Sequence, residues 1–129
     1  RVARAHSADM IMRGFFAHTN PDGEDPTARA RRIGFMARRP GPDGKPRVGL
    51  SENIARAGIY SSIRLVRREG RVIRRNIVWQ SPNGIAEQVV KGWMSSPGHR
   101  ENLLDADKVS AAVGLHQERE HIFITQNLF

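Results

Sequence analysis

Three residues carry side chains that could do acid, base or metal chemistry near neutral pH: His18, Glu52 and His99. Two neutral imidazoles and one carboxylate are ligand types that Zn²⁺ takes in proteins, with a fourth position left to water. The same three could act as general acid and base, because histidine titrates near neutrality. Each is predicted to lie at the edge of an element, where side chains meet at the rim of a core. Their long separations mean that the sequence alone does not show convergence.

His99 belongs to the stretch WMSSPGHRENLLD, from Trp93 to Asp105. Serine favours the position that caps a helix and proline the first helical position, so Ser96-Pro97 predicts the start of a short helix that carries His99. On that helix His99 and Leu103 share one face. Two interpretations stay open: a chemical role for the ring, or hydrogen bonding within a structured turn.

Other signals of catalysis are few. The chain has no spacing typical of zinc proteases, serine-hydrolase elbows, phosphate loops or dinucleotide sites. Ser51, Ser95 and Ser96 are candidate nucleophiles only because they lie near the other candidates. His6 falls inside a predicted helix, where a surface or hydrogen-bonded role is preferred. Glu52 by itself is most simply a surface or helix-start carboxylate.

The elements that must position these residues follow from apolar periodicity and turn signals. The pattern predicts an amphipathic helix over 2–16, a helix over 27–33 capped by Asp25-Pro26, a loop over 36–49, two basic strands about Glu69-Gly70, a helix over 85–93, and a C-terminal hairpin with strands from 111 and 122. Helices interleaved with strands that can pair antiparallel indicate an α+β layered fold. We expect one domain over 1–129.

Charge is the strongest compositional signal. Lys and Arg number 21 against 13 acids, a formal charge of +8. Such a field attracts anionic partners, including nucleic acid, anionic lipid and cell-wall polymers, although a solvated surface is the simpler interpretation. The scarcity of aromatic residues argues against a nucleic-acid stacking surface. The absence of cysteine excludes disulfides, thiolate metal sites and a cysteine nucleophile.

The N-terminal residues start within a helical pattern and are not a signal peptide. We therefore expect that an upstream segment has been removed. No apolar run approaches the length of a membrane span, so the sequence predicts no transmembrane segment.

Four motifs in a fixed order carry a family resemblance: FFAHTNPDG with His18, SENIA with Glu52, WMSSPGHRENLL with Trp93 and His99, and the ending TQNLF. In these motifs the chain resembles the CAP superfamily of cysteine-rich secretory proteins, antigen 5 and pathogenesis-related 1 proteins. It is similar to the short, cysteine-free prokaryotic SCP-like branch, over nearly its whole length. The resemblance implies an α-β-α sandwich with a central antiparallel sheet between helices. It also implies a secreted or cell-envelope location.

The same resemblance implies a cleft that holds a divalent metal in some relatives, often zinc. His18 and His99 match the two cleft histidines, and Glu52 matches the first cleft glutamate. The place of the second glutamate is taken by Ser96. The stretch over 61–80 is longer than in short relatives, and the family pattern does not explain its basic hairpin.

Three functions are weighed on these grounds. The first is an extracytoplasmic binding module, monomeric, with His18, Glu52 and His99 lining a cleft for Zn²⁺ and with an anionic envelope component or lipid as partner. The second is a hydrolase, peptidase-like, in which a histidine or a metal-bound water works with Glu52. The third is a basic polyanion or nucleic-acid binder. We expect binding rather than catalysis, and no nucleic acid.

Overall fold

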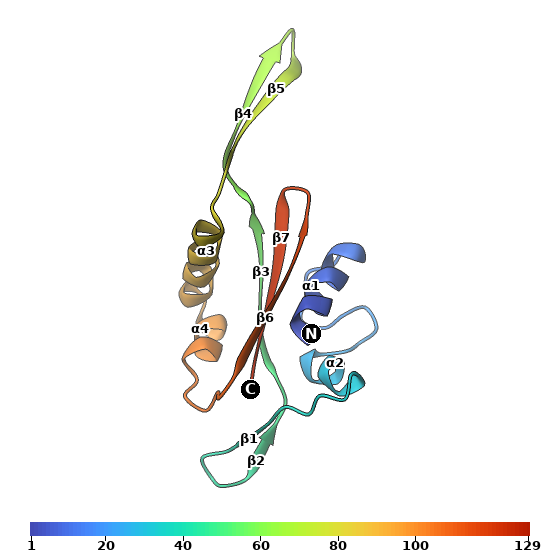
Figure 1. Cartoon of the computed structure of the whole chain (residues 1–129), viewed down its shortest axis with the longest axis vertical. Helices are drawn as coiled ribbons and strands as arrows, with labels where there is room; N and C mark the ends of the chain where they lie inside the picture. The colour runs from blue at the N-terminus through green and yellow to red at the C-terminus, as the bar shows by residue number, and fades with distance from the viewer.

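The computed structural model describes all residues from 1 to 129 and shows helices on both sides of a central sheet (Figure 1). The helices are α1 (Val2–Met12), α2 (Pro26–Arg32), α3 (Pro82–Ser95) and α4 (Pro97–Leu104). The strands are β1 (Arg38–Pro40), β2 (Pro46–Val48), β3 (Ser51–Gly58), β4 (Tyr60–Arg68), β5 (Arg71–Trp79), β6 (Ala111–Glu118) and β7 (His121–Leu128). None of the four helices combines the length and the apolarity that a membrane crossing needs.

The central sheet has the strand order β3-β7-β6, and both pairings are antiparallel. Leu128 of β7 pairs with Ser51 on one side and with Ala111 on the other. Helices α1 and α2 lie on one side of this sheet and α3 and α4 on the other (Figure 1). The predicted α-β-α sandwich is therefore confirmed.

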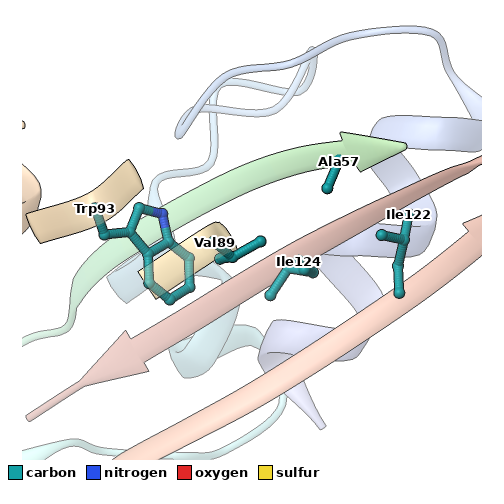
Figure 2. Packing of buried hydrophobic residues seen from close by; sticks show 5 residues of the cluster. All are labelled: Ala57, Val89, Trp93, Ile122 and Ile124. Carbon is teal, nitrogen blue, oxygen red and sulfur yellow. The ribbon is translucent and has the colours of Figure 1, made fainter. Parts of the chain in front are cut away.

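An apolar cluster joins α3 to the sheet. Its buried members are Ala57, Val89, Trp93, Ile122 and Ile124 (Figure 2). The Trp93 indole lies against β3, and its Nε1 donates to the main-chain oxygen of Ile54 at 3.0 Å. Burying a valine or isoleucine side chain contributes about 1.5 to 3 kcal/mol, so this cluster holds α3 against the sheet.

The opposite face of the sheet receives α1 at very short range. Ser7 Oγ donates to the main-chain oxygen of Gly114 at 3.1 Å and lies 2.8 Å from Thr125 Oγ1. A Cβ atom at Gly114 would collide with the backbone of Ala3 and Arg4. Helix α1 therefore touches β6 backbone to backbone, and only glycine fits at this crossing.

Helices α1 and α2 end in the same way, at a Gly-Phe pair. Gly14 and Gly34 have φ of 69° and 78°, a left-handed conformation that glycine adopts without strain. Phe15 N–H bonds to the Met10 oxygen and Phe35 N–H to the Ala30 oxygen, both at 3.0 Å. These are the hydrogen bonds of the Schellman motif, which ends a helix.

Two element boundaries were predicted wrongly. The helix predicted over 2–16 ends at Met12, because the Gly14 turn stops it earlier than the apolar pattern does. The region 36–49 was predicted as a loop, but it contains the short hairpin β1–β2, in which Arg39 pairs with Arg47.

Glu52 also lies in a different element from the one expected. The sequence favours a helix-start carboxylate before an apolar turn, whereas Glu52 is the second residue of the eight-residue strand β3. Polar side chains on both faces of the start of this strand remove the apolar alternation that marks a strand.

The other predicted elements are present. The helix capped by Asp25 is α2, with Asp25 Oδ1 accepting from Ala28 N at 2.7 Å. The C-terminal hairpin is β6–β7, and α4 begins at Pro97 as the Ser-Pro signal predicts. The basic strands are β4 and β5, joined at Glu69-Gly70, where both residues have positive φ. This pair of conformations matches the right-handed twist of a two-residue hairpin.

We predict that Gly114→Ala destabilises the chain by about 3 kcal/mol or more, because α1 must move off β6 to admit a methyl group. Gly92→Ala is the matched control. Gly92 lies within α3, and a methyl group added there would meet nothing within 4 Å, so alanine should be neutral or stabilise by up to about 1 kcal/mol. Urea unfolding followed by tryptophan fluorescence measures both variants. Equal midpoints for the two variants would contradict the close α1–β6 contact.

Candidate functional site

Glu52, near the start of β3, is a buried acidic residue, and its side chain meets three others. We call His6, His18, Arg29 and Glu52 the Glu52 cluster. Helix α1 supplies His6, α2 supplies Arg29, β3 supplies Glu52, and the loop between the helices supplies His18. The Glu52 side chain is almost completely buried. A carboxylate removed from water in this way needs partners of opposite charge or hydrogen-bond donors.

Arg29 is the main partner of Glu52. Its Nη2 donates to Glu52 Oε2 at 2.6 Å, and its side chain is only 5% exposed. Its Nη1 donates to the main-chain oxygens of His18 and Glu24, at 2.6 and 3.0 Å. Those two carbonyls flank the turn at Asn20 to Gly23, so one guanidinium ties this turn to the sheet. The planar fork of arginine suits such simultaneous donation, which a lysine could not reproduce.

His18 is the member of the cluster that faces solvent. Its Nδ1 lies 3.0 Å from Glu52 Oε1, and half of its side chain is exposed. Because Glu52 faces a guanidinium, it is an ionised acceptor, and the His18 Nδ1–H donates to it. That tautomer leaves the His18 Nε2 lone pair directed away from the carboxylate. Glu52 therefore orients the imidazole of His18, an arrangement that general-base catalysis uses.

His6 closes the cluster from the side of α1. Its Nε2 donates to the main-chain oxygen of Ala17 at 3.0 Å and lies 3.6 Å from Glu52 Oε1. Burial lowers the pKa of His6, against the charge of Glu52, which raises it, while the charge of Arg29 lowers it further. His6 is thus a neutral, buried histidine whose Nδ1 has no hydrogen-bond partner. The hydrogen-bonded role preferred from the sequence describes it well.

His99 lies on the other side of the sheet from Glu52. Neighbouring residues of a strand point to opposite faces, and Glu52 points to α1 and α2. Asn53 points to α4, where its Nδ2 donates to the main-chain oxygen of His99 at 3.2 Å. The ring of His99 lines a groove of about 320 Å³ with residues that include Trp93 and Ser96. The structure therefore brings His18 and Glu52 together and places His99 apart from them.

The motif around His99 satisfies the free edge of β3. Three carbonyls of this edge strand accept from side chains: Glu52 O from Asn102 Nδ2 at 3.3 Å, Ile54 O from Trp93 Nε1 at 3.0 Å, and Gly58 O from Gln80 Nε2 at 3.3 Å. Asn102 Nδ2 also reaches Asn53 Oδ1 at 2.9 Å. An edge strand whose carbonyls are occupied cannot pair with another chain there. In this motif Trp93 and Asn102 therefore have a clear structural role.

Two of the candidate serines are already engaged. Ser51 Oγ accepts from Lys108 Nζ at 2.8 Å, and the same Nζ lies 3.3 Å from Asp105 Oδ2. A lysine ammonium has three donors and no acceptor, so it donates to the serine oxygen and does not take a proton from it. Ser95 Oγ donates to the Lys91 main-chain oxygen at 2.8 Å. Neither of these hydroxyls faces a free base.

The Glu52 cluster does not fit a zinc centre. One Glu52 oxygen is occupied by Arg29, and His6 Nε2 carries the proton that it gives to Ala17. The Arg29 guanidinium already supplies positive charge at the carboxylate, and it would repel a metal cation held by the same group. No group of three or more His, Cys, Asp or Glu side chains is arranged to hold a metal ion. Zinc binding by His18, Glu52 and His99, which the sequence led us to expect, is untested, and this geometry argues against it.

Sequence reasoning missed Arg29, which joins three of the segments around the cluster. Its only sequence signal is a spacing of four from Ile33, which proves to be the exposed residue at the C-cap of α2. Arg31 and Arg32 stand beside it with nothing in composition to separate them. Asn53 and Asn102 were also missed, because an isolated asparagine predicts a turn as readily as a buried hydrogen bond.

Comparison with known proteins gives one family and one fold. A model of the cysteine-rich secretory protein family, CAP, matches residues 1–128. The crystal structure of an extracellular protein containing an SCP domain, from Bacillus anthracis strain Ames, is similar, with a TM-score of 0.62 and 24% sequence identity. The match covers 98% of this chain and 30% of that one, so this chain spans less than a third of its length. No curated protein matches the chain.

We predict that Glu52→Gln lowers the free energy of unfolding by about 3 to 5 kcal/mol, because it leaves the Arg29 charge buried without a counter-charge. Asp22→Asn is the matched control, since Asp22 pairs with Arg13 at the exposed surface and its loss should change little. Urea unfolding of both variants measures the difference.

The double variant Glu52→Leu with Arg29→Met separates the ion pair from the fold. If the buried pair is the reason for the loss, the double variant should be more stable than Glu52→Gln, because no isolated charge remains. A double variant that is less stable by the sum of its two single changes would contradict this account.

Proposed function

Because the chain belongs to the cysteine-rich secretory protein (CAP) family, we propose that it is an extracytoplasmic binding module whose partner is an anionic component of the cell envelope. The location is supported by the similar Bacillus anthracis structure, which belongs to an extracellular protein. This chain corresponds to 30% of that protein, so the proposal concerns the domain alone.

One observation carries the proposal: basic residues are concentrated in the hairpin β4–β5, which projects from the sandwich (Figure 1). Of the 21 basic residues, six are arginines in the hairpin β4–β5, which holds a single acid, Glu69, at its turn. All six arginines are exposed, and only Arg75 forms an ion pair, with Glu120 at 2.9 Å. Arginine forms bidentate hydrogen bonds with phosphate and carboxylate, so this element suits an anionic polymer or surface.

The Glu52 cluster supports binding over catalysis. Both Glu52 oxygens are engaged inside the protein, and Ser51, its neighbour in the chain, accepts from a cationic lysine. The one observation in favour of a hydrolase is the oriented imidazole of His18. A peptidase-like reaction would use His18 Nε2 as the base toward a water molecule, with Glu52 as the positioning carboxylate. We keep this hydrolase as the second candidate.

We predict that the chain binds a soluble poly(glycerol phosphate) and not uncharged dextran. Because the attraction is electrostatic, affinity should fall at least about tenfold as ionic strength rises from about 0.05 to 0.2 M. Fluorescence anisotropy of labelled polymer measures it, with duplex DNA as competitor. Equal affinity for dextran would refute the proposal, and a preference for DNA would favour the nucleic-acid alternative.

A zinc titration tests the metal and the hydrolase together. We expect calorimetry near pH 7.5 to show no stoichiometric zinc binding, because Arg29 occupies the carboxylate that a metal would share. We also expect no peptide hydrolysis with or without zinc. Micromolar binding that disappears in the double variant His18→Ala with His99→Ala would overturn the first expectation. Peptide hydrolysis by the unchanged chain that is lost in the single variant His18→Ala would establish the hydrolase.

A further inference from the structure

The hairpin β4–β5 stands apart from the rest of the fold. It projects beyond the sandwich (Figure 1), and its two strands pair only with each other. Beyond its base, its one side-chain link to the sandwich is the ion pair of Arg75 with Glu120. An isolated two-stranded hairpin is marginally stable in water, so a hairpin of nine-residue strands with no layer behind it is expected to need a partner.

Apolar side chains are exposed along the hairpin between the arginines. Ile73 is 60% exposed, and Leu65, Val72 and Val78 are each more than 40% exposed. Ile73 is the extra residue at an irregularity in the register, since Val66 pairs with Arg74 and Arg67 pairs with Val72. A β-bulge leaves its extra residue unpaired and changes the direction in which a side chain points. Near the turn, Val72 and Ile73 are therefore presented outward among charged neighbours.

The neighbours of these apolar residues are basic. Arg67, Arg68, Arg71 and Arg74 neighbour Val72 and Ile73 along or across the strands at the turn end of the hairpin, and none of the four forms an ion pair. We call Arg67, Arg68, Arg71, Val72, Ile73 and Arg74 the hairpin tip. Exposed apolar surface costs free energy in water and marks an interaction site when it is contiguous. The tip thus combines four exposed arginines with two exposed apolar side chains.

We propose that the hairpin tip docks on an anionic lipid bilayer. A bilayer interface takes both kinds of side chain at once, with apolar groups at the acyl boundary and arginines at the level of the phosphates. A soluble polyanion would bind the arginines and leave Val72 and Ile73 in water. The aromatic residues of the hairpin, Tyr60 and Trp79, lie at its base, so the tip offers nothing to stack on a nucleotide base. This inference rests on the proposed anionic partner and names it as lipid.

Vesicle flotation tests the inference with phosphatidylcholine vesicles that contain or lack phosphatidylglycerol. We expect binding only to the anionic vesicles. The triple variant Arg67→Gln, Arg68→Gln, Arg71→Gln should bind about 100-fold more weakly, at about fivefold for each arginine. The matched control Arg31→Gln, Arg38→Gln, Arg100→Gln removes the same charge from exposed arginines outside the hairpin, none of them in an ion pair. It should retain most of the binding.

The variant Val72→Ser with Ile73→Ser separates lipid from polymer, because it keeps every charge. It should bind anionic vesicles at least about tenfold more weakly while binding soluble poly(glycerol phosphate) as the unchanged chain does. Undiminished vesicle binding would overturn the lipid assignment. If the unchanged chain binds the polymer but no vesicles, the lipid assignment is wrong and the proposed function is intact. If the unchanged chain binds neither the polymer nor the vesicles, both the lipid assignment and the proposed function are wrong.

A direct readout comes from the absence of cysteine, since one introduced thiol carries a probe at a chosen place. An environment-sensitive dye on Ile73→Cys should shift to the blue on anionic vesicles. The same dye on Glu101→Cys, exposed on α4, should not shift. Equal shifts at both positions would contradict docking by the tip.

Removing the hairpin tests the proposal with a variant whose folding can be checked. The base of the hairpin is closed without it, because Gln80 N–H bonds to the Ile59 oxygen at 3.0 Å. Replacing Ser61 to Val78 by a short Gly-Ser link should keep cooperative unfolding and remove vesicle binding. A shortened chain that folds and still binds the anionic vesicles would overturn the proposal.

Discussion

The ion pair between Arg29 and Glu52 is the interaction on which the α1–α2 side of the sheet depends. Its charges lie between α2 and β3, where water cannot solvate them, so each one makes the other necessary. Through Nη1 the same arginine holds two carbonyls of the loop after α1. The position of His18 is therefore a consequence of Arg29, and the exposed imidazole is only as well ordered as the buried pair beneath it.

The two faces of β3 separate two kinds of polar structure. On one face Glu52 meets charged partners, and on the other Asn53 meets the amides and carbonyls of α4. A single strand thus anchors two layers through polar contacts, while α1 and α3 add backbone contact at Gly114 and apolar burial at Trp93. This arrangement explains why the motif GHRENLL is rich in hydrogen-bonding groups: its main chain and Asn102 bond to β3. Its asparagine completes the free edge of the sheet.

The sequence predicted those parts of the fold whose signals are local. Gly34, the Asp25-Pro26 cap and the Glu69-Gly70 turn impose backbone geometry by themselves, so the elements that they bound were found. The start of β3 was not found as a strand, because Glu52 and Asn53 are both buried among polar partners and give no apolar alternation. Arg29 could not be selected among its neighbours, since its burial is decided by the position of Glu52, 23 residues later.

The hairpin β4–β5 obeys a different constraint from the rest of the chain. Ile59 and Gln80 already meet at its base, where Gln80 Nε2 also donates to the oxygens of Gly58 and Tyr60. The step from β3 to α3 therefore closes at this point, and of the side chains between these two residues only that of Arg75, paired with Glu120, bonds to the sandwich. They cost the protein exposed apolar surface and mutual repulsion among arginines. An element that the fold neither needs nor shelters is best explained by an external partner that is anionic enough for its charge and apolar enough for Ile73.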